Sequence, residues 1–213
     1  MEYSTLLKKN LKIFYNKNNK NSFELLEGCG SVIVSAPHSV EQIRNGKIKF
    51  AEYQTGAITR ILHEKIGCPV IYKTKNCNDD ANYDDKSDYR DFLIQYIKKN
   101  DIKLLMDLHQ MAPRREMNID IGTGRGKNIL QRYDLLEKII TFFNNNGVKN
   151  IMVDEIFDAT YKNTVSAHVS SSCSIPCFQI EINSKLVSDK YDEYNIDSII
   201  KSLLQIIEYM NMH

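Results

Sequence analysis

Three short segments of the chain carry the histidine and carboxylate side chains that bind metals or move protons. The first contains His38 and Glu41 in "PHSVE", the second ends at His109 in "LLMDLHQ", and the third carries Glu181 in "CFQIEIN". Two histidines and one glutamate form one of the ligand sets of catalytic zinc, with a fourth position left for water. We therefore predict one Zn²⁺ ion held by His38, Glu41 and His109.

Two further carboxylates would serve such a site. Zinc lowers the pKa of its bound water and polarises a carbonyl group, and a carboxylate outside the ligand set then carries the water's proton to the leaving amine. Glu181 is the predicted catalytic carboxylate. Asp107 precedes His109 by two residues, so in a strand both point to the same face and Asp107 can orient the imidazole. Each residue also has a purely structural interpretation. A histidine at the end of a strand, for example, is often only hydrogen-bonded to its neighbours.

Periodicity predicts the elements that position these residues. Runs of apolar and β-branched residues indicate strands at 31–36, 68–74, 102–109, 117–124, 149–155 and 177–183. Helical spacing of apolar residues indicates helices at 53–67, 88–100, 133–147 and 195–210. Residues 11–15 and 22–28 are expected to form a hairpin or a sheet edge.

The alternation of strands and helices predicts an α/β fold of the phosphorylase/hydrolase-like type. We expect a single domain over residues 1–213, with a central, mostly parallel (mixed) sheet and helices on both faces. Ligands of such sheets bind beyond the carboxyl ends of the strands. The histidines and carboxylates lie at those strand ends, so the fold would bring them together.

Composition limits the classes of partner. The chain has 28 Lys and Arg against 27 Asp and Glu, a balance that favours neither nucleic acid nor an anionic membrane. We see no signal peptide and no apolar stretch of transmembrane length. The five cysteines are irregularly spaced, which indicates reduced thiols. A cytoplasmic location is expected.

Five segments carry a family resemblance. In order they are "VSAPHSVEQ", "NYDDKSDYR", "LLMDLHQM", "NIDIGTG" and "FQIEIN", spanning Val34 to Asn183. They resemble the N-formylglutamate amidohydrolase family, which is related in fold to the zinc carboxypeptidases. The resemblance implies zinc on the two histidines and Glu41, with Glu181 as the catalytic carboxylate. Two features depart from the family pattern: Gln110 stands where we expect glycine, and the chain is short for the family. Both departures concern the substrate more than the chemistry.

Several polar residues are candidates for holding a substrate with a free carboxylate. Arginine binds a carboxylate through two parallel hydrogen bonds. Arg115 is predicted to hold a carboxylate or the developing oxyanion, and His168 to donate to the transition state from a mobile loop that could cover the site. The remaining substrate-binding candidates are Arg90, Asn82, Arg114 and Asn183. A solvated surface position is the alternative for each arginine.

The sequence thus favours a zinc-dependent amidohydrolase that cleaves a carbon–nitrogen bond of an N-acyl or N-formyl amino acid, or of a peptide-like end. A zinc carboxypeptidase or a γ-glutamyl hydrolase on the same scaffold is the nearest alternative. A catalytically inactive binding protein is another, although binding alone does not require Glu181. The "GTGRGKN" segment lacks the ending of a phosphate loop, so nucleotide binding is rejected.

Overall fold

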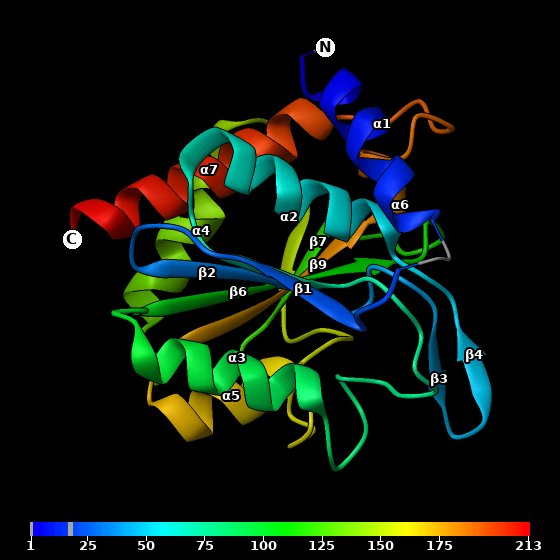
Figure 1. Ribbon diagram of the computed structural model, residues 1–213. Coiled ribbons are helices and arrows are strands. Elements are labelled where there is room, and N and C mark those ends of the chain that lie inside the picture. The colour runs from blue at the N-terminus through cyan, green and yellow to red at the C-terminus, as the bar shows by residue number, and fades with distance from the viewer. Residues whose placement is uncertain (1, 17–18) are drawn as a thin grey trace.

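The fold is built on one seven-stranded mixed sheet, shown in a computed structural model that describes residues 2–16 and 19–213 (Figure 1). Its order is β1-β5-β2-β6-β9-β7-β8. The strands are β1 (Phe23–Leu26), β2 (Val32–Ala36), β5 (Val70–Lys73), β6 (Leu104–Met111), β7 (Ile119–Gly122), β8 (Ile151–Val153) and β9 (Cys177–Asn183). The pairs β1–β5 and β7–β9 are antiparallel, and the other neighbours are parallel.

Helices cover both faces of this sheet (Figure 1). One face packs against α1 (Glu2–Phe14), α2 (Tyr53–Ile66), α4 (Tyr133–Asn145) and α7 (Ile196–Met212). The other face packs against α3 (Asp88–Lys99) and α5 (Val165–Cys173), and the short α6 (Ser184–Val187) follows β9. The predicted fold class, a single α/β domain with a mixed sheet, is confirmed. Within the described ranges, no helix combines the length and apolar character that crossing a membrane requires.

The three strands that carry the candidate site are neighbours at the centre of the sheet. β2, β6 and β9 are parallel and almost entirely buried, so their carboxyl ends meet at one edge. In the register of β6 with β9, His109 lies opposite Glu181. Central, parallel strands therefore bring the residues of three distant segments together, as the sequence predicts.

The structure differs from the expected elements in two segments. Residues 11–15, expected in a hairpin or edge, belong mostly to α1, whose buried Leu7, Asn10 and Phe14 follow helical spacing. The expected mobile loop around His168 is the helix α5, whose first turn is capped by the Thr164 hydroxyl, which accepts a hydrogen bond from the backbone of Ala167.

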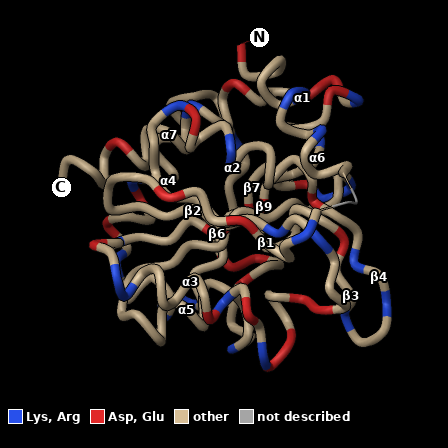
Figure 2. The backbone as a smooth tube through the Cα atoms, viewed as in Figure 1, with Lys and Arg blue, Asp and Glu red and all other residues tan. Residues whose placement is uncertain are grey.

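A separate two-stranded hairpin stands beside the sheet and was not expected. Its strands are β3 (Gln42–Arg44) and β4 (Lys47–Lys49). Figure 1 shows the hairpin projecting away from the layers, and Figure 2 shows basic residues along it. It lies between β2 and α2 in the chain, so it controls how the chain returns from His38 to the start of α2.

Candidate active site

Two histidines and one glutamate form a buried group that could hold a metal ion. They are His38, which follows β2, His109 in β6, and Glu52 immediately before α2. The two Nδ1 atoms lie 3.1 Å apart. Glu52 places Oε1 3.2 Å from the His38 Nδ1 and Oε2 3.4 Å from the His109 Nδ1. Ligand atoms about 2.0–2.1 Å from one tetrahedral zinc ion would be about 3.3 Å apart, so this group has the right spacing.

Each imidazole also has a buried aspartate behind it. The His38 Nε2 lies 2.9 Å from Asp80 Oδ1, and the His109 Nε2 lies 3.1 Å from Asp107 Oδ2. A neutral imidazole that donates from Nε2 carries a lone pair on Nδ1. The Nδ1 lone pairs of His38 and His109 and the Glu52 carboxylate therefore face one another. Such a cluster is repulsive unless a cation or a proton lies inside it. The donor set and its orienting aspartates therefore fit a zinc ion.

Glu52 occupies the place that was predicted for Glu41. The hairpin carries the chain away from His38 and back, and the Glu52 backbone N–H donates to the His38 carbonyl oxygen at 2.8 Å. The Glu41 side chain is partly exposed and instead acts on Tyr53, whose pKa is raised by burial and then by the Glu41 charge. The structure thus brings His38 and His109 together as expected, but not Glu41.

Surrounding donors hold Glu52 in its charged form. The Gln110 backbone N–H donates to Oε2 at 2.9 Å, and the Lys49 ammonium donates to Oε1 at 2.5 Å. Burial by itself would raise the pKa of Glu52, but Lys49 and the two imidazoles outweigh it and hold that pKa well below its usual range. A carboxylate that is ionised and firmly placed is suited to metal binding.

The same charges act on His109. Burial lowers the pKa of this imidazole, but Asp107 and Glu52 outweigh burial, so the pKa is raised well above its usual value. The two carboxylates thus favour a proton on this imidazole. Metal binding would displace that proton, because only a deprotonated nitrogen can be a ligand.

Glu181 is buried on β9, next to the candidate ligands but outside their group. Burial raises its pKa to about 8, against the opposing effect of the His109 charge. The Gln179 amide nitrogen donates to Glu181 Oε1 at 3.3 Å. A carboxyl group with a pKa near neutrality can both take up and release a proton at physiological pH. The proton-transfer role of Glu181 stays a prediction.

A cavity of about 520 Å³ opens above the candidate ligands. The hairpin contributes Arg44 and Lys49 to its wall. The segment 156–161 forms another part of the wall. The buried Asp120 carboxylate anchors this segment, because it accepts hydrogen bonds from the backbone N–H groups of residues 155, 156 and 157, at 3.2, 2.8 and 2.9 Å. Glu181 also lines the cavity. The volume is that of a small-molecule site.

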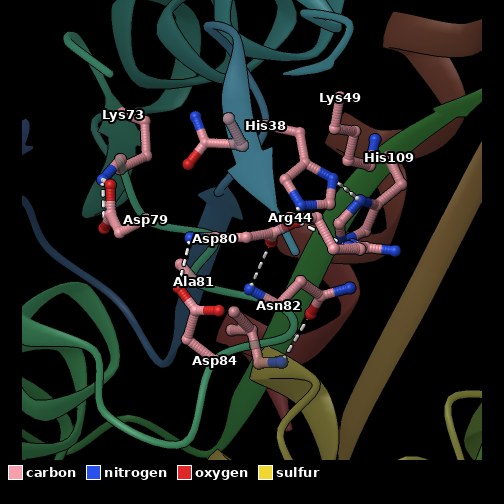
Figure 3. A network of polar contacts seen from close by, with 12 residues as sticks. His38, Arg44, Lys49, Lys73, Asp79, Asp80, Ala81, Asn82, Asp84 and His109 are labelled. Atoms are coloured by element: carbon pink, nitrogen blue, oxygen red, sulfur yellow. Dashed lines mark hydrogen bonds and ion pairs between the residues drawn. The ribbon is translucent and has the colours of Figure 1, made fainter. Parts of the chain in front are cut away.

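Arg115 is the arginine best placed for a substrate anion. It lines the cavity with its guanidinium 5.9 Å from the Phe157 ring, and its Nε is buried without a hydrogen-bond partner in the described part of the chain. The exposed Arg114 lies beside it at the rim. Asn82 also lines the cavity, where its Oδ1 accepts from the Val165 backbone N–H at 2.6 Å (Figure 3).

Three other predicted residues have structural partners instead of a place in the cavity lining. The buried Arg90 guanidinium donates to the carbonyl oxygens of residues 81, 84, 85 and 163. The Asn183 amide donates to the carbonyls of Arg115 and Met117, so it supports the Arg115 segment. His168 lies on α5, where burial and then the Arg90 charge lower its pKa. None of the three is among the residues that line the cavity.

Sequence reasoning missed Glu52, Asp80, Gln179 and Lys49 as parts of the site. Asp80 accepts hydrogen bonds from His38 and, at 2.8 Å, from the Arg44 Nε (Figure 3). Burial would raise the pKa of Asp80, but His38 and Arg44 lower it below its usual range. The signal for Asp80 was the acidic "NDDANYDD" loop, and the signal for Glu52 was an acidic residue directly before a helix.

Comparisons with protein-family models and with curated proteins find no match. Solved structures do match. An N-formylglutamate amidohydrolase from Ralstonia eutropha has a TM-score of 0.62 and 13% identity, covering 90% of this chain and 98% of that one. The chain has the fold of N-formylglutamate amidohydrolase. The resemblance seen in the sequence to the N-formylglutamate amidohydrolase family is therefore confirmed at the level of the fold.

Two further structures share the N-formylglutamate amidohydrolase fold. A bacteriophage poly-gamma-glutamate hydrolase has a TM-score of 0.57 and 14% identity, covering 92% of this chain and 94% of that one. A succinylglutamate desuccinylase from Chromobacterium violaceum has a TM-score of 0.54 and 12% identity, covering 87% of this chain and 67% of that one. The scaffold is thus shared by proteins whose names describe different hydrolytic reactions.

Proposed function

We propose that this protein is a zinc-dependent amidohydrolase that cleaves the amide bond of an N-acyl amino acid or of a peptide-like compound with a free carboxylate. The observation that carries the proposal is the buried group of His38, Glu52 and His109, with the separate carboxylate of Glu181 beside it. The neighbours of similar fold, with their names of amidohydrolase, hydrolase and desuccinylase, support it.

The two imidazoles and Glu52 would hold the ion, which when bound supplies a Lewis acid and lowers the pKa of water. Asp80 and Asp107 accept hydrogen bonds from the Nε2 atoms of His38 and His109, so the Nδ1 atoms of both imidazoles point toward the place where the ion would bind. Glu181 takes the proton from the attacking water and gives it to the leaving nitrogen. Arg115 binds the substrate carboxylate from the cavity wall.

A substrate panel separates this proposal from its nearest alternatives. A carboxypeptidase would cleave the last residue of a peptide, and a γ-glutamyl hydrolase would cleave a side-chain amide, both with the same metal group. An inactive binding protein would bind without turnover. The buried Glu181, with its raised pKa, favours an enzyme over a binding protein, since a ligand-binding role does not need a proton carrier.

Metal content and turnover test the ligand assignment. Wild-type protein is expected to bind one zinc ion, and His109→Ala and Glu52→Gln are expected to lose it. Glu41→Gln is the matched control, because it makes the same chemical change three residues from His38 yet should keep the ion. Glu181→Gln should keep zinc and lose turnover on formyl and acyl amino acids. Stoichiometric zinc in Glu52→Gln, or full activity in Glu181→Gln, would overturn the assignment.

A further inference from the structure

A second hollow adjoins the main cavity beside the candidate ligand Glu52. Its volume is about 380 Å³. It shares with the main cavity the residues Lys49, Glu52, Gln110, Met111 and Ala112. Because Glu52 is a candidate ligand and belongs to both linings, a molecule bound at the metal group can extend into both hollows.

The two hollows differ in chemistry. The main cavity carries three arginines, of which Arg44 is paired with Asp80, whereas Arg114 and Arg115 have no ion pair within the described ranges. The second hollow has no arginine in its lining, and its Lys49 is paired with Glu52. The lining residues that it does not share with the main cavity are mostly apolar, among them Ile48, Phe50 and Pro113. The main cavity therefore suits an anion, and the second hollow suits an apolar group.

The apolar border is unusually exposed. Phe50 is 81% exposed and Ile48 is 61% exposed, although both are large hydrophobic residues. Both lie at the end of the hairpin, at the mouth of the second hollow. Contiguous exposed apolar side chains beside a site mark a surface that a ligand covers. This apolar border adjoins the candidate ligand Glu52, so it is within reach of a substrate bound at the metal group.

We infer that the substrate is an amide that joins a carboxylate-bearing unit to an apolar unit. The carboxylate lies in the main cavity near Arg115, the scissile amide lies at the shared wall, and the apolar unit lies against Phe50 and Ile48. The second hollow has ample room, since a cavity of about 150 Å³ holds a benzene ring. The inference rests on the proposed amide hydrolysis and adds the substrate class.

Two matched series of amides test the inference and its direction. One series varies the acyl group on glutamate from formyl through acetyl to hexanoyl and benzoyl. The other varies the amine on a glutaryl amide from methylamine to butylamine and benzylamine. In one series, kcat/KM is expected to rise about tenfold or more from the smallest to the largest apolar group. The series in which it rises tells whether the apolar unit is the acyl or the amine part.

Phe50→Ser assigns the effect to the second hollow. The ratio of kcat/KM for the largest to the smallest apolar group is expected to fall about tenfold in this variant. Met212→Ser is the matched control, because Met212 is 74% exposed and lies on α7, outside both linings. Its ratio should equal that of the wild type. A preference for formyl and methylamine, or an unchanged ratio in Phe50→Ser, would overturn the inference.

Binding separates this inference from the proposed function. If no amide of either series is hydrolysed, the proposed function fails, and calorimetric titration of the same amides into wild type and Phe50→Ser still decides the inference. Tighter binding of the large apolar amides to wild type, lost in Phe50→Ser, supports it. Equal affinity across a series in both proteins refutes it.

Discussion

Asp80 gives the most informative single test of how the candidate metal group is organised. Its carboxylate is fully buried and accepts from the His38 Nε2 at 2.9 Å, from the Arg44 Nε at 2.8 Å and from the Asn82 backbone N–H at 2.9 Å. Asp80→Asn keeps the shape but removes the charge and one acceptor. We expect it to weaken zinc binding while leaving all three candidate ligands in place.

The expected size of the effect follows from these contacts. A hydrogen bond to a charged group contributes about 1.5–3 kcal/mol, and about 1.4 kcal/mol corresponds to a tenfold change in an equilibrium constant. The zinc Kd of Asp80→Asn should therefore rise about 10- to 100-fold, the range typical of residues that orient metal ligands. Asp107→Asn should act similarly through His109.

Competition with a fluorescent zinc chelator measures this Kd. Asp85→Asn is the control, since it makes the same charge change in the same loop on a side chain that is 84% exposed and does not contact His38. Thermal melting in a chelator shows whether the fold itself has been weakened. If Asp80→Asn binds zinc as tightly as Asp85→Asn, the orienting role of the buried aspartate is refuted.

Three further predictions concern stability and thiol chemistry. Arg90→Met should lower the free energy of unfolding by about 2–4 kcal/mol in urea denaturation, because four backbone carbonyls lose their donor; a loss below about 0.5 kcal/mol would contradict this. Gly56→Ala should cost about 1–3 kcal/mol in the same assay, since the added Cβ would lie 2.5 Å from neighbouring side chains, and wild-type stability would show that this contact is not tight. Burial raises the pKa of Cys68 to about 12, so at pH 8 about one thiol in 10⁴ is ionised, against about one in ten for an ordinary pKa near 9. Labelling at pH 8, read by mass spectrometry, should therefore modify the exposed Cys29 and Cys77 much faster than the buried Cys68, and equal rates would refute the burial argument.

The strand ends were the most predictable part of the site. His38 follows β2, and His109 and Glu181 lie near the carboxyl ends of β6 and β9, which a parallel sheet places at one edge. Asp107 was predictable for the same reason, because strand periodicity fixes which side chains share a face. These inferences need only local patterns and one rule of topology.

Glu52 was not predictable from local patterns, because its position depends on an excursion of the chain. The sequence spacing favoured Glu41, which is only three residues from His38. The hairpin, however, returns the chain so that Glu52 bonds back to the His38 carbonyl. Arg90 was misjudged for a related reason, since four carbonyl oxygens from two distant loops converge on its guanidinium. Long-range convergence of this kind leaves no periodic signal in the sequence.

Among the strands that the structure describes, β3 and β4 pair with each other and with no strand of the seven-stranded sheet. The tip of this hairpin, Asn45 and Gly46, has positive φ angles of 51° and 70°, and a Cβ added at Gly46 would meet no other atom. Lengthening or replacing this tip would leave the layered core untouched. The residues on either side of the tip, however, reach the candidate metal group, because Arg44 donates to Asp80 and Lys49 donates to Glu52. An exposed turn is therefore linked, within a few residues, to the side chains that position the candidate ligands.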